Sequence, residues 1–194
     1  MTTTPASTGR LRRQKRISRV SAILKWVLSG VLAALLLVWA GYVLAILVPS
    51  LSRFSPETGL DVAGAHRAFA DIPILQRCAL ALVESVLFAL LAGAAWELRL
   101  LFARFQRTDY FSAKTLGHVF LFGVWLISYA VMDILSDPIL SVLATLDRPE
   151  GQRTLEVSLD GGEIFFAILG ALMLVFGAVL REAANLDDEN RRFV

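Results

Sequence analysis

The sequence predicts an all-α protein, a polytopic membrane four-helix bundle with short loops. The chain of 194 residues is 56% apolar and only 19% charged, whereas a soluble domain is about 25% charged. Its apolar residues gather in four long blocks rather than in short alternating runs. Its basic residues gather before the first block and after the second and fourth blocks, which is the charge asymmetry of multi-pass membrane proteins.

The predicted organisation has three parts. Residues 1–25 form a basic, largely disordered cytoplasmic N-terminal segment, residues 26–182 form a four-span transmembrane domain, and residues 183–194 form a polar cytoplasmic tail. A helix of about 20 apolar residues crosses the hydrocarbon core. The expected spans are residues 26–48, 74–102, 116–135 and 164–180.

The first span follows seven basic residues and contains no charge from Trp26 to Val48. It is longer than the apolar core of a signal peptide, which predicts a retained anchor. The basic segment has two interpretations, a simple topogenic cluster or, over residues 11–25, a helix lying on anionic headgroups. Small residues spaced by four, which permit close helix approach, occur in this span as Gly30 with Ala34 and Gly41 with Ala45.

Two loops separate the spans on the other side of the membrane. In the first loop, Leu60 to Phe69 has the pattern of a short amphipathic helix. In the second loop, Pro138 to Leu146 is apolar enough for a short capping helix beyond the third span, and Thr154 to Leu159 alternates as a short strand would.

The second span carries Glu84 about ten residues from its start. An intramembrane carboxyl group is a candidate functional site. The alternative is a protonated side chain that donates a hydrogen bond to another helix, with Tyr42, Ser128 or Tyr129 as partner. Arg77 and Asp133 are expected at one level of the membrane, where they could pair, and no single span carries paired carboxylates.

A short basic connector joins the second and third spans. Asp109 or Ser112 is expected to accept hydrogen bonds from free backbone amides and to start the next helix. The candidate connector residues are Arg104, Arg107, Asp109, Ser112 and Lys114. Placing this connector and both termini in the cytoplasm puts fourteen basic residues inside and five outside, which predicts this orientation.

Three segments resemble a bacterial family of four-helix membrane proteins of unknown function, the DUF2975 family. They are Asp109 to Ser112 with Thr115, then Gly162 to Phe165, and finally Val179 to Asn190. The resemblance implies a four-helix topology in the bacterial inner (plasma) membrane. The family has no established chemistry, so no catalytic residue is implied.

No catalytic constellation, phosphate-binding loop or metal-ligand spacing is evident in the sequence. His66 and His118 are far apart, and the lone Cys78 allows no internal disulfide. The expected function is therefore a non-enzymatic accessory or regulatory protein without a cofactor or metal, whose partners are the bilayer and either itself or another membrane protein, with no nucleic acid. The alternative is an oligomeric small transporter or channel-like protein that uses Glu84. A membrane enzyme would require several polar side chains to converge on one cavity.

Overall fold

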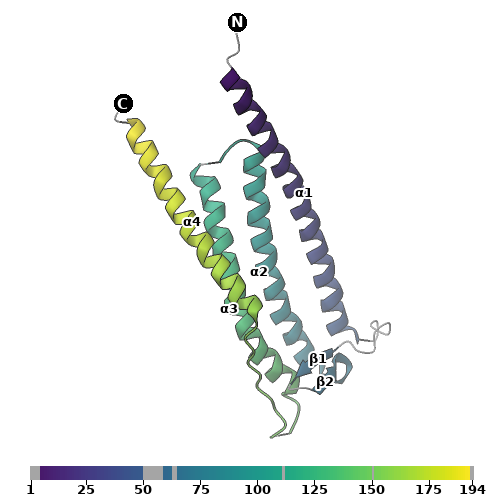
Figure 1. Cartoon of the computed structure of the whole chain (residues 1–194). Coiled ribbons are helices and arrows are strands. Elements are labelled where there is room, and N and C mark those ends of the chain that lie inside the picture. Colours follow the sequence, from purple (N-terminus) through teal and green to yellow (C-terminus); the bar gives the residue numbers. More distant parts are fainter. Residues whose placement is uncertain (1–4, 50–58, 63–64, 111, 150, 193–194) are drawn as a thin grey trace. The chain divides into compact units, whose positions relative to one another are not determined.

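The computed structural model confirms the predicted fold class. It describes residues 5–49, 59–62, 65–110, 112–149 and 151–192. In these residues the chain forms four long helices (Figure 1): α1 (Pro5–Leu47), α2 (Ile74–Gln106), α3 (Ala113–Thr145) and α4 (Gly161–Arg192). Each contains a stretch that is long and apolar enough to cross a membrane.

Helix α1 begins at Pro5, so the described part of the basic N-terminal segment is helical rather than disordered. From Arg10 to Ser29 the chain contains no glycine or proline. Extending an existing helix fixes one residue for each hydrogen bond gained, whereas starting a new helix is costly. The apolar span therefore serves as the nucleus from which the helix continues into the basic residues.

Helix α3 does not end near residue 135 but runs through Pro138. A proline inside a helix removes one amide donor and crowds the carbonyl one turn earlier. The hydroxyls of Ser136 and Ser141 donate to the carbonyls of Asp133 (2.7 Å) and Pro138 (3.0 Å) in the same turns, and membrane helices tolerate an internal proline where nearby groups satisfy the freed backbone. The expected separate helix beyond the third span is consequently the last part of α3. Asp133 and Asp137 thus lie one turn apart on one helix, contrary to the expectation that no span pairs carboxylates.

The chain forms two compact units. We name the first the connector unit, because it contains the turn between α2 and α3, and the second the hairpin unit, because it contains two short strands. The connector unit comprises Met1–Ala33, Ala92–Trp125 and Leu169–Val194, and the hairpin unit comprises Ala34–Leu91 and Leu126–Ile168.

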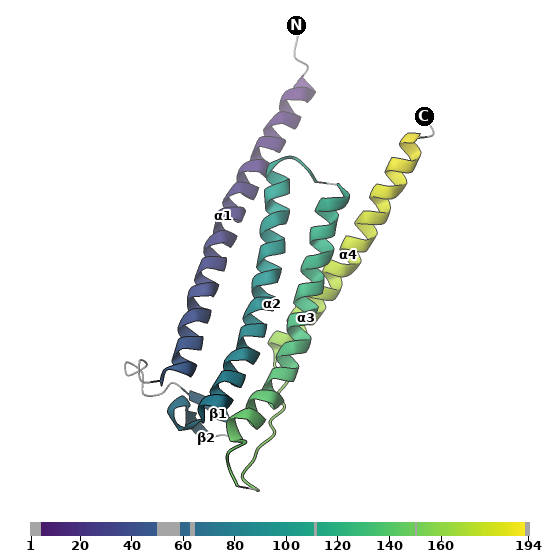
Figure 2. The same cartoon turned by 180° about the vertical axis from the view of Figure 1, so that it is seen from behind.

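In the hairpin unit, β1 (Gly59–Val62) pairs antiparallel with β2 (Ala65–Ala68), and the 3₁₀ helix η2 (Phe69–Asp71) follows. These elements replace the amphipathic helix expected from Leu60 to Phe69. A side chain at residue 59 would overlap the main chain of β2 at Arg67, so the glycine permits the close strand approach. Figure 2 shows the hairpin beside the start of α2.

The core of the hairpin unit joins α1, α2 and α3 to the segment that follows β2. The Phe69 ring packs edge-on against Tyr42, with 6.2 Å between ring centroids. The buried cluster consists of Ile46, Phe69, Ile72, Leu80, Ala81 and Ala144.

Residues 152–160, which we name the strap, form no strand despite their alternating pattern. Instead, the Thr154 amide donates to Thr145 Oγ1 (3.3 Å), and the Glu156 amide donates to Ser141 Oγ (3.0 Å). Alternate residues of an extended chain and residues one helical turn apart repeat at similar distances of about 6–7 Å. The α3 hydroxyls therefore accept hydrogen bonds from the strap amides, which in a sheet would bond to the carbonyls of a neighbouring strand.

In the connector unit, α3 and α4 approach closely through glycines. A methyl group at Gly123 would lie 2.8 Å from the Gly170 carbonyl oxygen, and one at Gly177 would lie 3.0 Å from the Phe120 backbone. By contrast, a methyl group at Gly30 on α1 would meet nothing within 4 Å. The glycines of α4 thus pack against α3 within the chain, whereas Gly30 of α1 contacts no other described helix at this position.

Polar bonds hold α1 to α2 in the same unit. Ser18 Oγ donates to the Gln106 carbonyl (3.1 Å), and Lys25 Nζ donates to Gln106 Oε1 (2.9 Å). About one turn beyond Lys25 on α1, Ser29 Oγ accepts from Arg99 Nε (2.9 Å). These bonds use the charged ends of the helices, where apolar packing gives little specificity.

We predict that Gly123→Ala destabilises the protein by about 1–3 kcal/mol, because backbone atoms rather than a flexible side chain oppose the added methyl. Gly30→Ala is the matched control and should be neutral or stabilising by about 0.5–1 kcal/mol, because alanine favours the helix. Thermal unfolding in detergent distinguishes the two variants. Equal melting temperatures would contradict the close α3–α4 packing.

Candidate functional site

A cavity of about 240 Å³ lies between α2 and α3 in the hairpin unit. Its lining residues recur every three or four positions, so they share one face of each helix. The α2 wall is Glu84, Leu87, Phe88 and Leu91, and the α3 wall is Tyr129, Asp133, Ser136, Asp137 and Leu140. Three carboxyl groups, a phenol and a hydroxyl thus converge in otherwise apolar surroundings, and no lining residue is basic.

The structure brings Asp133 to Glu84 rather than to Arg77. Glu84 lies 22 residues before the end of α2, and Asp133 lies 20 residues after the start of α3, so antiparallel helices place them at similar levels. The Arg77 guanidinium instead faces the Leu47 carbonyl (3.5 Å), and no ion pair joins it to Asp133 within the described residues. The expected pairing was wrong because α3 extends ten residues beyond its predicted end.

Of the expected partners of Glu84, Tyr129 lines the same cavity, while Ser128 does not. Tyr42 is half-buried and within electrostatic range of Glu84. Carboxyl groups at membrane depth are costly unless paired, protonated or in contact with water or a ligand. The convergence of Glu84, Asp133 and Asp137 without a basic partner therefore makes this cavity the candidate site.

Glu163, near the start of α4, adds a fourth carboxyl group to this region. The residue is 6% exposed, and its Oε2 has no hydrogen-bond partner among the described residues. It interacts electrostatically with Asp133 and Tyr129. This burial was not predicted, because the fourth span was expected to start at residue 164, three residues after α4 begins.

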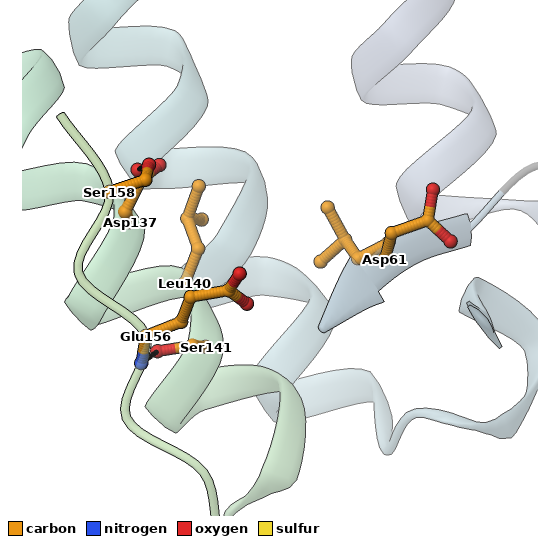
Figure 3. Close-up of a pocket in the computed structure, with 7 residues that line it drawn as sticks. Asp61, Asp137, Leu140, Ser141, Glu156 and Ser158 are labelled. Carbon is orange, nitrogen blue, oxygen red and sulfur yellow. Dashed lines mark hydrogen bonds between the residues drawn. The ribbon is translucent and has the colours of Figure 1, made fainter. Parts of the chain in front are cut away.

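A second cavity, of about 200 Å³, lies beside β1 and the strap (Figure 3). Asp137 and Leu140 line both cavities. The Ser158 hydroxyl of the strap donates to Asp137 Oδ2. The other lining residues are Leu60 and Asp61 of β1, Ser141 of α3, and Glu156 of the strap.

Arg67 on β2 holds the hairpin against the end of α3. Its side chain is 8% exposed, and its two terminal nitrogens donate to the Asp147 carboxylate at 2.8 and 2.6 Å. It also donates to the carbonyls of Ala144 and Asp71. The hydrogen bond from Arg67 lowers the pKa of the Asp147 carboxyl group. Sequence reasoning missed this pair, because its members lie 80 residues apart in segments without a shared motif.

The connector between α2 and α3 caps the start of helix α3, as predicted. Ser112 Oγ accepts from the Thr115 amide (3.2 Å) and donates to Asp109 Oδ2 (2.8 Å). Arg104 Nη1 donates to the same Asp109 oxygen (3.2 Å). The hydrogen bond from Ser112, with that from Arg104, lowers the pKa of Asp109. Thr108 turns the chain with φ of 60°, in the left-handed region that few non-glycine residues adopt.

The remaining connector cations, Arg107 and Lys114, are exposed. Acidic residues of the C-terminal tail are candidate partners for these cations. Glu182 is also exposed and forms no ion pair within the described residues. The side chains of Asp187, Asp188 and Glu189 lie outside the described residues.

The connector unit also contains a partly buried pair that the sequence did not indicate. His118 Nδ1 lies 2.6 Å from Glu97 Oε2, with side-chain exposures of 18% and 14%. The antiparallel course of α2 and α3 brings together these residues, which are 21 positions apart. In the described part of the chain, no group of three or more acidic, histidine or cysteine side chains is placed to hold a metal ion.

Four described helices are long and apolar enough to cross a membrane, which is the pattern of a multi-pass α-helical membrane protein. No protein-family model, curated protein or solved structure matches the chain. Membership of the DUF2975 family therefore stays a prediction.

We predict that Arg67→Met destabilises the protein by about 2–4 kcal/mol, because it removes several charge-assisted hydrogen bonds and leaves Asp147 without its cation. Arg153→Met is the control, since Arg153 is exposed and donates only to the Arg148 carbonyl at 3.2 Å. Thermal unfolding at neutral pH measures both effects. A similar melting temperature for the two variants would contradict the role of Arg67.

The pH profile provides a further check of this pair. The folded-state pKa of Asp147 is depressed, so its contribution is present above the unfolded pKa, about 3.9 for aspartate, and is lost as the pH falls through the folded value. The melting temperature of the wild type should therefore fall more steeply below about pH 4 than that of Arg67→Met.

Proposed function

We propose that this protein is a non-enzymatic accessory or regulatory component of the bacterial plasma membrane, which packs with itself or with a larger membrane complex. Both termini and the α2–α3 connector face the cytoplasm in this proposal, as the distribution of basic residues favours. The supporting observation is the open small-residue face of α1. At Gly30 and at Gly41 an added methyl group would meet nothing within 4 Å.

Membrane helices associate through close packing at small residues, because lipid tails are as apolar as the side chains they would replace. In α4, Gly170 and Gly177 are buried and serve contacts within the chain. In α1, Gly30, Ala34 and Gly41 are exposed, and only 6% of the apolar span is buried. A helix glycine costs roughly 0.5–1 kcal/mol relative to alanine, which packing against a second helix would offset.

The cavity between α2 and α3 does gather several polar side chains, the condition expected of a membrane enzyme. Its polar lining consists of carboxyl groups, Tyr129 and Ser136. The Ser136 hydroxyl donates to a carbonyl of its own helix, and no histidine, cysteine or lysine lines the cavity. Nucleophilic catalysis needs a nucleophile beside an activating base, so this lining favours binding over catalysis.

We expect Gly30→Leu with Gly41→Leu to weaken association about tenfold, which corresponds to roughly 1.4 kcal/mol. Ala178→Leu on α4 is the control, because Ala178 is an exposed small residue outside the proposed face. Particle mass after gentle detergent extraction, together with co-purified proteins, gives the readout. A strictly monomeric wild-type particle without any partner would count against the proposal.

A second candidate function is an oligomeric small transporter or channel-like protein that uses Glu84. The cavity that Glu84 shares with Asp133 and Asp137 favours it. Four spans are too few for a typical transporter built from two repeat halves, so this function requires association of several chains.

For this candidate, Glu84→Gln should abolish cation flux in proteoliposomes, because it removes the ionisable group at membrane depth. Glu182→Gln, which changes an exposed carboxyl group of the connector unit, should leave flux unchanged. Wild-type protein without measurable flux, or unaltered flux in Glu84→Gln, would eliminate the transporter.

A further inference from the structure

The α2–α3 cavity combines two kinds of wall. Glu84, Asp133 and Asp137 supply negative charge, and Leu87, Leu91 and Leu140 supply apolar surface. Phe88 and Tyr129 add aromatic rings, whose faces attract cations. A ligand that satisfies all three features has a positive charge and an apolar body.

Glu163 of α4 adds a buried carboxyl group beside this region, although it does not itself line the cavity. Glu163 and Phe166 are three residues apart on α4 and therefore share a face. The Phe166 ring packs edge-on against Tyr129, with 5.1 Å between centroids, and Tyr129 lines the cavity. Glu163 thus faces the α3 wall near Asp133, where its Oε2 is buried without a partner. A buried charge of this kind is costly until a positive group or a proton neutralises it.

The placement of the carboxyl groups favours an organic cation over a metal ion. No three acidic, histidine or cysteine side chains in the described residues are grouped closely enough to hold a metal. Drug-sized ligands occupy cavities of about 300–1,000 Å³, and this cavity of about 240 Å³ suits a smaller molecule. An ammonium group on a short apolar body fits both its size and its walls.

We propose that the α2–α3 cavity binds a small organic ammonium cation, which reaches it through the adjoining cavity beside β1 and the strap. The proposal deepens the second candidate function and rests on it for the importance of Glu84. Asp61 and Glu156 line the adjoining cavity, and Asp137 belongs to both (Figure 3). Asp137 and Glu156 therefore place negative charge along this path, whereas the exposed Asp61 carboxylate lies 3.0 Å from His66 Nδ1. The Ser158 hydroxyl donates to Asp137 Oδ2, and because a carboxylate accepts several hydrogen bonds, this contact does not exclude a cation from Asp137.

Titration of the full chain in lipid nanodiscs with benzylammonium tests the proposal. We expect saturable heat with the wild type and an affinity at least tenfold lower for Glu84→Gln with Asp133→Asn. Leu140→Phe fills space common to both cavities while keeping every carboxyl group, and it should also abolish binding. Glu182→Gln should bind like the wild type. Thermal unfolding without ligand identifies any variant that fails to fold. If either the double carboxyl variant or Leu140→Phe fails to fold, the binding measured for the other one tests the proposal.

Benzyl alcohol, which has nearly the same shape without the charge, should bind at least tenfold more weakly. Equal binding of the alcohol would reduce the site to an apolar cavity, and equal competition by sodium or calcium chloride would make it a metal site. Either result overturns the proposal, as does wild-type protein without saturable binding. Because binding is measured without flux, a transporter of another cation or an associating accessory protein would survive this failure.

Discussion

The Arg67–Asp147 pair determines whether the hairpin can form a wall of the candidate site. A two-stranded hairpin of eight residues has little stability of its own. Arg67 joins β2 to the C-terminal end of α3 through both its salt bridge and the Ala144 carbonyl. In this position Leu60 and Asp61 of β1 line the second cavity together with Asp137 and Leu140. Because Leu60 is the cross-strand partner of Arg67, the ion pair positions this wall through the neighbouring strand.

The same end of α3 shows how a chain in lipid meets its backbone hydrogen-bonding needs. In the hydrocarbon core, water cannot replace a lost backbone partner. Pro138 disturbs the helix, while nearby serine hydroxyls bond to carbonyls of the same turns. Ser141 and Thr145 also accept amides from the strap. The hydroxyls of Ser141 and Thr145 therefore hold an extended segment against α3, and this segment lines the second cavity.

The features predicted from sequence are those with local causes. The apolar blocks predict four helices. Ser112 is recognisable as a helix cap because its hydroxyl oxygen accepts from the amide of Thr115, which lies only three residues later. Errors arose where distant residues decide the outcome. The third helix was predicted to end before Pro138. Asp133 was therefore expected near the membrane surface at the level of Arg77, whereas it lies at the level of Glu84. The Arg67–Asp147 pair depends on residues 80 positions apart, and such a distance leaves no periodic signal.

The two units differ in how their charged side chains are paired. In the connector unit, Arg99, Lys25 and Arg104 have hydrogen-bond partners on nearby elements. In the hairpin unit, the cavity gathers Glu84, Asp133 and Asp137 without a basic lining residue. Folding stability alone gives no reason to bring like charges together in an apolar setting, because each raises the cost of ionising the others. A function that uses a positive group at this site gives a reason for the arrangement, and Asp137 and Glu156 would place negative charge on the proposed route through the second cavity.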